Sequence, residues 1–118
     1  MIHLAARAIR GAVQVAADTH EEIEKATVAL VREVLRKNGL DADGIEALFF
    51  TVTPDLTANI PPLALVEEGS FQVPSLCAAE PRWDGEMPRV IRVMAFVRKD
   101  RGEPIEHVYL NGTAATRP

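Results

Sequence analysis

The sequence is poor in cysteine, in basic side chains and in long apolar runs, and each shortage excludes a class of protein. Its single cysteine, Cys77, cannot form a disulfide within the chain and fits a reducing compartment, so we expect a cytoplasmic protein. The 13 basic side chains are outnumbered by 17 acidic ones, giving a formal net charge of −4, which argues against general nucleic-acid binding. No apolar run approaches the about 20 residues that span a bilayer, so no membrane association is expected. Arginine and histidine break the N-terminal stretch, which argues against a signal peptide.

Several motifs of catalysis and cofactor binding are also missing. The sequence has no glycine-rich phosphate loop and no nucleophile elbow. His3, His20 and His107 show no metal-ligand spacing, and we assign them no role. Cys77 lies in an apolar stretch with no histidine close in sequence, which is more typical of a core or pocket-lining residue than of a nucleophile. We therefore predict no metal and no cofactor.

The patterns that are present indicate one small α/β domain over residues 1–118. The chain is 47% hydrophobic, so it can build a core, and its length suits a single domain. The clearest element is a helix at about 19–38, where Thr19 and Glu22 fit a capping box, apolar residues repeat at helical spacing, and Gly39 ends the repeat.

The remaining segments predict strands and one short helix. A double proline suits the start of a short helix near 62–68. Strand patterns cover 3–16, 45–53, 71–80 (interrupted by Pro74), 88–100 and 106–110. This order describes an α+β fold, a mixed β-sheet with helices on one face. Because the other face of such a sheet lacks cover, we expect an oligomer.

Four polar side chains interrupt otherwise apolar strand patterns: Arg10, Glu80, Arg92 and Tyr109. Burying an unpaired charge is costly, so each must be paired, solvated at a cavity, or bound to a ligand. The simplest interpretation is solvent exposure or structural ion pairing. Arg92 fits it poorly, because the residues that alternate with it at positions 90, 94 and 96 are apolar. Two arginines that converge with a tyrosine and a carboxylate would form a pocket for a small dianion, which the overall charge does not forbid.

The chain resembles the AroH-type chorismate mutases, the small trimeric class typified by bacilli. Segments in the family's order and spacing carry the resemblance nearly end to end: AIRGAV, DTHEEI, TVTPDLTA, VPSLCAAE, PRVIRVM, HVYL and the closing RP. It implies a homotrimer that forms a pseudo-α/β-barrel, with active sites at the subunit interfaces. It also implies an isomerase of the shikimate pathway and aromatic amino acid biosynthesis. The implied reaction is the Claisen rearrangement of chorismate to prephenate, without cofactor or covalent intermediate.

The same resemblance assigns roles to the polar residues. Arg92 would donate to the ether oxygen, where negative charge grows in the transition state, and to a carboxylate. Glu80 would accept a hydrogen bond from the ring hydroxyl, and Arg10 and Tyr109 would hold a carboxylate. The other substrate-binding positions that it assigns are Leu76, Cys77, Ala78, Ala79 and Arg117.

Two positions depart from the family pattern. Ile60 stands where a phenylalanine is usual, and Val66 stands where an arginine is usual, so the pocket mouth is less basic than is typical. This departure motivates one alternative, a related mutase or lyase that acts on isochorismate or aminodeoxychorismate. A second alternative is a non-catalytic trimeric domain that binds a small acid.

Overall fold

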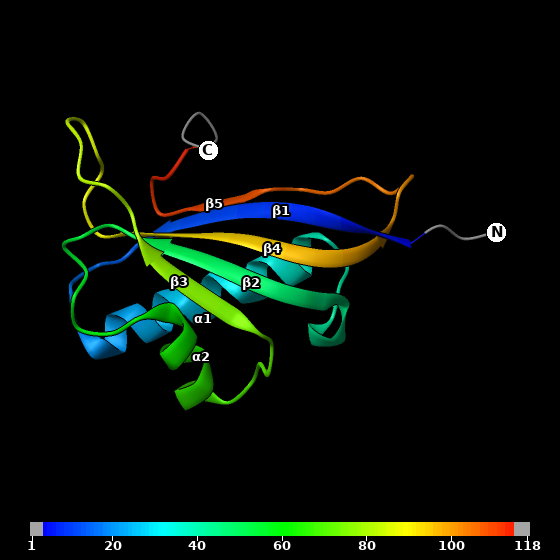
Figure 1. The fold of residues 1–118 in the computed structure, drawn as a ribbon, viewed down its shortest axis with the longest axis horizontal. Coiled ribbons are helices and arrows are strands. Elements are labelled where there is room, and N and C mark those ends of the chain that lie inside the picture. The colour runs from blue at the N-terminus through cyan, green and yellow to red at the C-terminus, as the bar shows by residue number, and fades with distance from the viewer. Residues whose placement is uncertain (1–3, 115–118) are drawn as a thin grey trace.

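The computed structural model describes residues 4–114, which form a single five-stranded sheet with its two α-helices on one side (Figure 1). The order of elements confirms the prediction. In chain order they are β1 (Leu4–Gln14), α1 (His20–Lys37), the 3-10 helix η1 (Ala42–Gly44), β2 (Ile45–Val52), α2 (Pro61–Glu68), β3 (Ser75–Ala79), β4 (Val90–Asp100) and β5 (Val108–Leu110). The strand predicted over 71–80 begins only after Pro74, because a proline cannot donate to the strand ladder.

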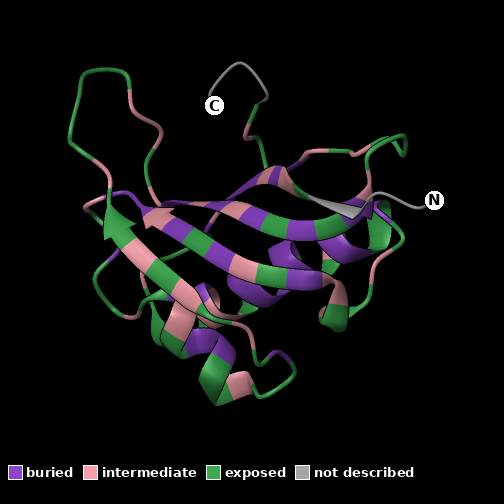
Figure 2. Cartoon of the chain, turned by 45° about the vertical axis from the view of Figure 1, so that its right-hand side comes forward, coloured by how far each residue is buried: buried purple, intermediate pink, exposed green. Residues whose placement is uncertain are grey.

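The sheet is mixed, with β4 at its centre and the order β3-β2-β4-β1-β5. β4 runs antiparallel to both β1 and β2, whereas the outer strands β5 and β3 run parallel to their inner neighbours. Successive side chains of a strand point to opposite faces, and Figure 2 shows the resulting alternation of buried and exposed residues along β2 and β4. The sheet therefore has a helix-covered face, which holds the core, and an open face.

Helix α1 supplies most of the cover. Thr19 caps its N-terminus by accepting from the backbone N–H of Glu22 at 3.2 Å, as the capping pattern predicts. Gly11 of β1 allows the helix to lie close, because a Cβ at that position would stand 3.0 Å from Leu30 Cδ1 and 3.1 Å from Val93 Cγ1. None of the helices within residues 4–114 is both long enough and apolar enough to cross a membrane.

Asn38 ties the end of α1 to the segment that leads into β5. Its side-chain amide donates to Val34 O at 2.8 Å and to Glu106 O at 2.9 Å, and its Oδ1 accepts from the backbone N–H of Glu106 at 2.7 Å. Lys99 Nζ donates to the Asn38 carbonyl at 2.8 Å. Asn38 is only 5% exposed, so these bonds fix a buried junction between the helix and the sheet.

Candidate active site on the open face of the sheet

The strand register gathers the predicted polar residues on the open face. Arg92 of β4 lies opposite Ala12 of β1, and Ala12 in turn lies opposite Tyr109 of β5. Arg10 lies on the same side of β1 as Ala12, two residues earlier. Thr51 of β2 lies opposite Arg92 on the other side of β4. Four strands thus place their side chains on one patch.

A cavity of about 200 Å³ opens on this patch. Its polar lining comes from Arg10, Arg92, Tyr109 and Thr51, and Phe49 and Met94 contribute apolar walls. Two guanidinium groups facing one small cavity suit an anionic ligand, and the apolar walls lower the local dielectric and strengthen their field.

Glu80 is held against Arg92 at this site. Arg92 Nε donates to Glu80 Oε2 at 3.1 Å, and Thr51 Oγ1 donates to the same oxygen at 2.7 Å. Both charged side chains are only 16% exposed, so this is a semi-buried ion pair and not a solvated surface contact. Glu80 lies just beyond the end of β3, where its backbone N–H donates to Val52 O at 2.8 Å.

Tyr109 brings a buried hydroxyl with no protein partner among residues 4–114. Tyr109 lines the cavity together with Arg10, so a ligand there can supply the missing bond. Nearby, the Arg10 backbone N–H donates to His107 Nδ1 at 2.9 Å. Burial and the Arg10 charge lower the pKa of His107, which favours the neutral ring that this bond requires.

A second cavity, of about 190 Å³, adjoins the first through Ala12 and Arg92. Met87, Gly112 and Thr113 also line it, so the segment after β5 borders the site. Arg117, which the resemblance assigns to the cover of the pocket, lies outside the described residues.

Cys77 does not join this cavity within one chain. It lies opposite Phe50 in the β2–β3 pairing and packs against the core on the helix-covered face. Burial raises the pKa of its thiol, which disfavours a nucleophilic thiolate.

The neighbouring Leu76, by contrast, lies opposite Phe49 on the open face and is 69% exposed. Ala78 shares the open face and Ala79 the helix-covered one, because directions alternate along β3.

The two positions that depart from the family pattern lie away from the Arg92 cavity. Ile60 precedes α2 and Val66 lies on its exposed side, with Val66 74% exposed. Val66 also borders a surface hollow of about 590 Å³ between the end of α2 and the start of β3. Ile60 and Val66, which the family resemblance places at a pocket mouth, are therefore not part of the Arg92 cavity of their own subunit.

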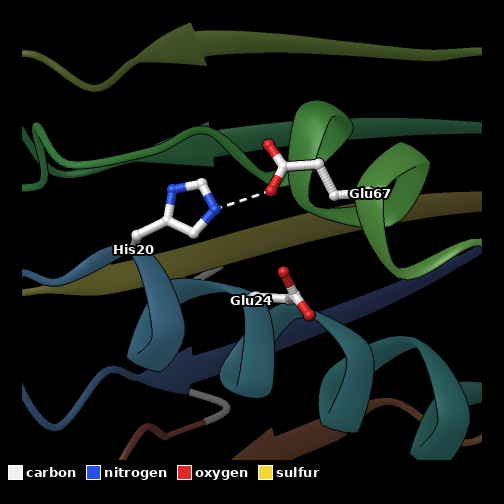
Figure 3. Close-up of side chains that lie close together, drawn as sticks. All are labelled: His20, Glu24 and Glu67. Atoms are coloured by element: carbon white, nitrogen blue, oxygen red, sulfur yellow. Dashed lines mark hydrogen bonds and ion pairs between the residues drawn. The ribbon is translucent and has the colours of Figure 1, made fainter.

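One group of described side chains could hold a metal ion, and it lies on the helices (Figure 3). The ligand atoms of His20, Glu24 and Glu67 lie within 4.8 Å of one another. Their direct contact is a 2.6 Å hydrogen bond between His20 Nε2 and Glu67 Oε2, which joins the start of α1 to the end of α2. This bond and the Glu67 charge raise the pKa of His20, which favours the charged ring. His20, to which the sequence analysis assigned no role, thus forms an ion pair with Glu67 when it is protonated.

Sequence reasoning also missed Thr51, which belongs to the Glu80–Arg92 pair. Threonine is common in strands, so nothing in the local pattern distinguished it. The one signal in the sequence was its place two residues before the TPD turn. Only the structure shows that this position lies on the strand next to the one that carries Arg92.

Comparisons with known proteins bear on this arrangement. Residues 6–118 match the sequence model of the family described as chorismate mutase type I. The chain is 41% identical over 114 residues to chorismate mutase AroH of Thermus thermophilus, covering 95% of this chain and 93% of the relative. It is 36% identical over 114 residues to chorismate mutase AroH of Bacillus subtilis, covering 95% and 90%. A solved chorismate mutase from Clostridium thermocellum shares the fold with a TM-score of 0.82 at 41% identity, covering 90% of this chain and 96% of that one. The family model covers most of the chain and both AroH relatives are more than 30% identical to it, so the chain belongs to the chorismate mutase type I family.

Proposed function

We propose that the protein is a chorismate mutase that rearranges chorismate to prephenate in the open-face cavity. The observation that carries the proposal is the convergence of Arg10, Arg92 and Tyr109 on one cavity, with Glu80 bound to Arg92. Chorismate carries two carboxylates, a ring hydroxyl and an ether oxygen, and the four side chains offer a complementary set of donors and an acceptor.

The reaction is a unimolecular exchange of bonds. The ether C–O bond breaks while a C–C bond forms between the ends of the substrate, and no proton, electron or group passes to the protein. Partial negative charge grows on the ether oxygen, and a guanidinium fixed beside it stabilises that charge more in the transition state than in the ground state. We assign this role to Arg92, because Glu80 and the strand hold it in place before the ligand arrives.

The other residues select the reactive shape of the substrate. Arg10 and Tyr109 would hold a carboxylate at one end, and Glu80 would accept from the ring hydroxyl at the other. Holding both ends favours the compact conformer in which the reacting carbons meet, which is the orientation part of catalysis.

We further propose that the protein is a cytoplasmic homotrimer with active sites at its interfaces. The open face exposes Phe49, Phe96 and Leu76 at 40%, 39% and 69%, which supports a covering partner. Cys77 and Val66 lie away from the Arg92 cavity of their own chain, so a pocket role for either requires that it serve the cavity of a neighbouring subunit.

The test is conversion of chorismate by the purified protein in the presence of EDTA, with prephenate identified as the product. Arg92→Ala should lower kcat by hundreds-fold or more, roughly the cost of losing such a donor. Arg98→Ala is the matched control, because Arg98 shares the strand and face but pairs with Glu46 and lies 67% exposed. Intact turnover in Arg92→Ala, with the oligomer unchanged by light scattering, would contradict the mechanism.

A second candidate reaction keeps the cavity and changes the substrate. Its motive is the departure from the family pattern at Ile60 and Val66, which would bear on this cavity only from a neighbouring subunit. Product analysis with isochorismate and aminodeoxychorismate would detect this activity, and prephenate as the dominant product from mixed substrates would exclude it.

A further inference from the structure

We infer that Thr51 is a positioning residue of the active site, whose hydroxyl fixes the Glu80 carboxylate against Arg92. The inference rests on the proposed function. Thr51 Oγ1 and Arg92 Nε both donate to Glu80 Oε2, at 2.7 and 3.1 Å. Two donors on one oxygen restrict the carboxylate in a way that the ion pair alone does not, because each bond fixes a different direction.

The topology explains why the donor comes from β2. This strand lies between β3, which leads into Glu80, and β4, which carries Arg92. Thr51 lies opposite Ala78 on one side and Arg92 on the other, and Glu80 follows two residues after Ala78 on the same face. The 2.8 Å bond from the Glu80 N–H to Val52 O fixes the Glu80 backbone to the same strand. β2 therefore holds both the backbone and the side chain of Glu80.

The acceptor distinguishes this hydroxyl from an ordinary structural one. Thr27 of α1 shows the ordinary case, since its Oγ1 donates to the Ile23 carbonyl one helical turn earlier, at 2.7 Å. That bond satisfies a buried hydroxyl that would otherwise bond to water, and it contacts no charged group. Thr51 instead donates to a charged side chain that is paired with Arg92, and Arg92 lines the ligand cavity. Glutamate has several rotatable bonds, so without this donor its carboxylate and the Arg92 guanidinium can settle in more than one arrangement.

The consequence is kinetic. A donor that stabilises growing charge must stand in place before the reaction, and small misplacement is costly. Loss of the Thr51 hydroxyl should therefore act mainly on kcat, since it disturbs a contact that matters most in the transition state. A purely structural threonine would change the unfolding free energy and leave kcat alone.

The experiment compares Thr51→Val, Thr51→Ser and the control Thr27→Val in the chorismate assay. Valine keeps the size and the branching of threonine and removes the donor. We expect Thr51→Val to lower kcat by about tenfold, the scale of one hydrogen bond to a charged group, with a smaller change in KM. Serine should restore most of the loss, and Thr27→Val should keep the wild-type kcat.

A double-mutant cycle shows whether Thr51 acts through Glu80. In a Glu80→Ala background, Thr51→Val should lower kcat by much less than in the wild type, because the side-chain acceptor that Thr51 positions is gone. A wild-type kcat in Thr51→Val, or an equal loss in both backgrounds, would overturn the inference while leaving the proposed function in place. No conversion of chorismate by the wild type would overturn both.

Discussion

Replacing Tyr109 by phenylalanine should move stability and activity in opposite directions. The hydroxyl is buried and has no protein partner within residues 4–114, and the side chain lines the cavity with Arg10. Its burial therefore costs free energy in the ligand-free protein, and under the proposed function a ligand carboxylate supplies the missing bond.

The magnitudes follow from this geometry. A buried polar group without a partner costs about 1–3 kcal/mol, so Tyr109→Phe should keep or raise the unfolding free energy of the ligand-free protein, by up to about that amount. A hydrogen bond to a charged group contributes about 1.5–3 kcal/mol, so kcat/KM should fall by about 10- to 100-fold.

The assay pairs denaturant unfolding with steady-state kinetics on the same preparations. Protein concentration must be held constant, since assembly adds to the apparent stability. Arg98→Ala again provides a control that should change neither quantity strongly. A variant that loses more than about 1 kcal/mol of stability and keeps its kcat/KM would refute the reasoning, because the hydroxyl would then have a structural partner.

Two further predictions concern stability. Asn38→Ala should lower the unfolding free energy by about 1–3 kcal/mol with little change in kcat, because it removes the side-chain hydrogen bonds from a buried amide to Val34 O and to the partly buried backbone of Glu106. Denaturant titration measures this loss, and a value below about 0.5 kcal/mol would contradict the prediction. The hydrogen bond and charge of Glu67 raise the pKa of His20, so the ion pair stabilises the fold fully below the ordinary value of 6.5 and loses this effect as pH rises through the folded pKa. His20→Gln should thus lower the thermal midpoint at about pH 5.5 and not at about pH 9, and a deficit that grows with pH would reverse the assignment.

Local signals made most of the fold predictable. The Thr19 cap, the apolar repeat of α1 and the prolines that begin α2 each act within a few residues, so the sequence shows them directly. The first strand and β4 were likewise visible as apolar runs. The boundary at Pro74 shifted because the proline ends the pairing of β3 on that side.

Register and long-range docking made part of the site unpredictable. The sequence identified Arg10, Arg92, Glu80 and Tyr109 as misfits, and three of them line one cavity, with Glu80 bound beside it. Nothing local indicates that Cys77 faces away from Arg92, because that depends on how β3 pairs with β2. The Thr51–Glu80 contact joins residues 29 apart and the His20–Glu67 contact residues 47 apart, so each exists only once the strands or helices have docked.

The alternation of side chains along β1 and β4 has a consequence for how this enzyme can evolve. Arg10 and Ala12 face the cavity while Gly11 between them touches the core, and Arg92 and Met94 enclose the buried Val93 in the same way. Residues that shape the cavity and residues that pack the core are therefore neighbours in the sequence, but their side chains lie on opposite faces of the sheet. Changes at Met94, which is only partly buried, can reshape the ligand cavity while the packing on the helix-covered face stays intact. A new substrate preference is thus accessible through single substitutions that carry little cost in folding.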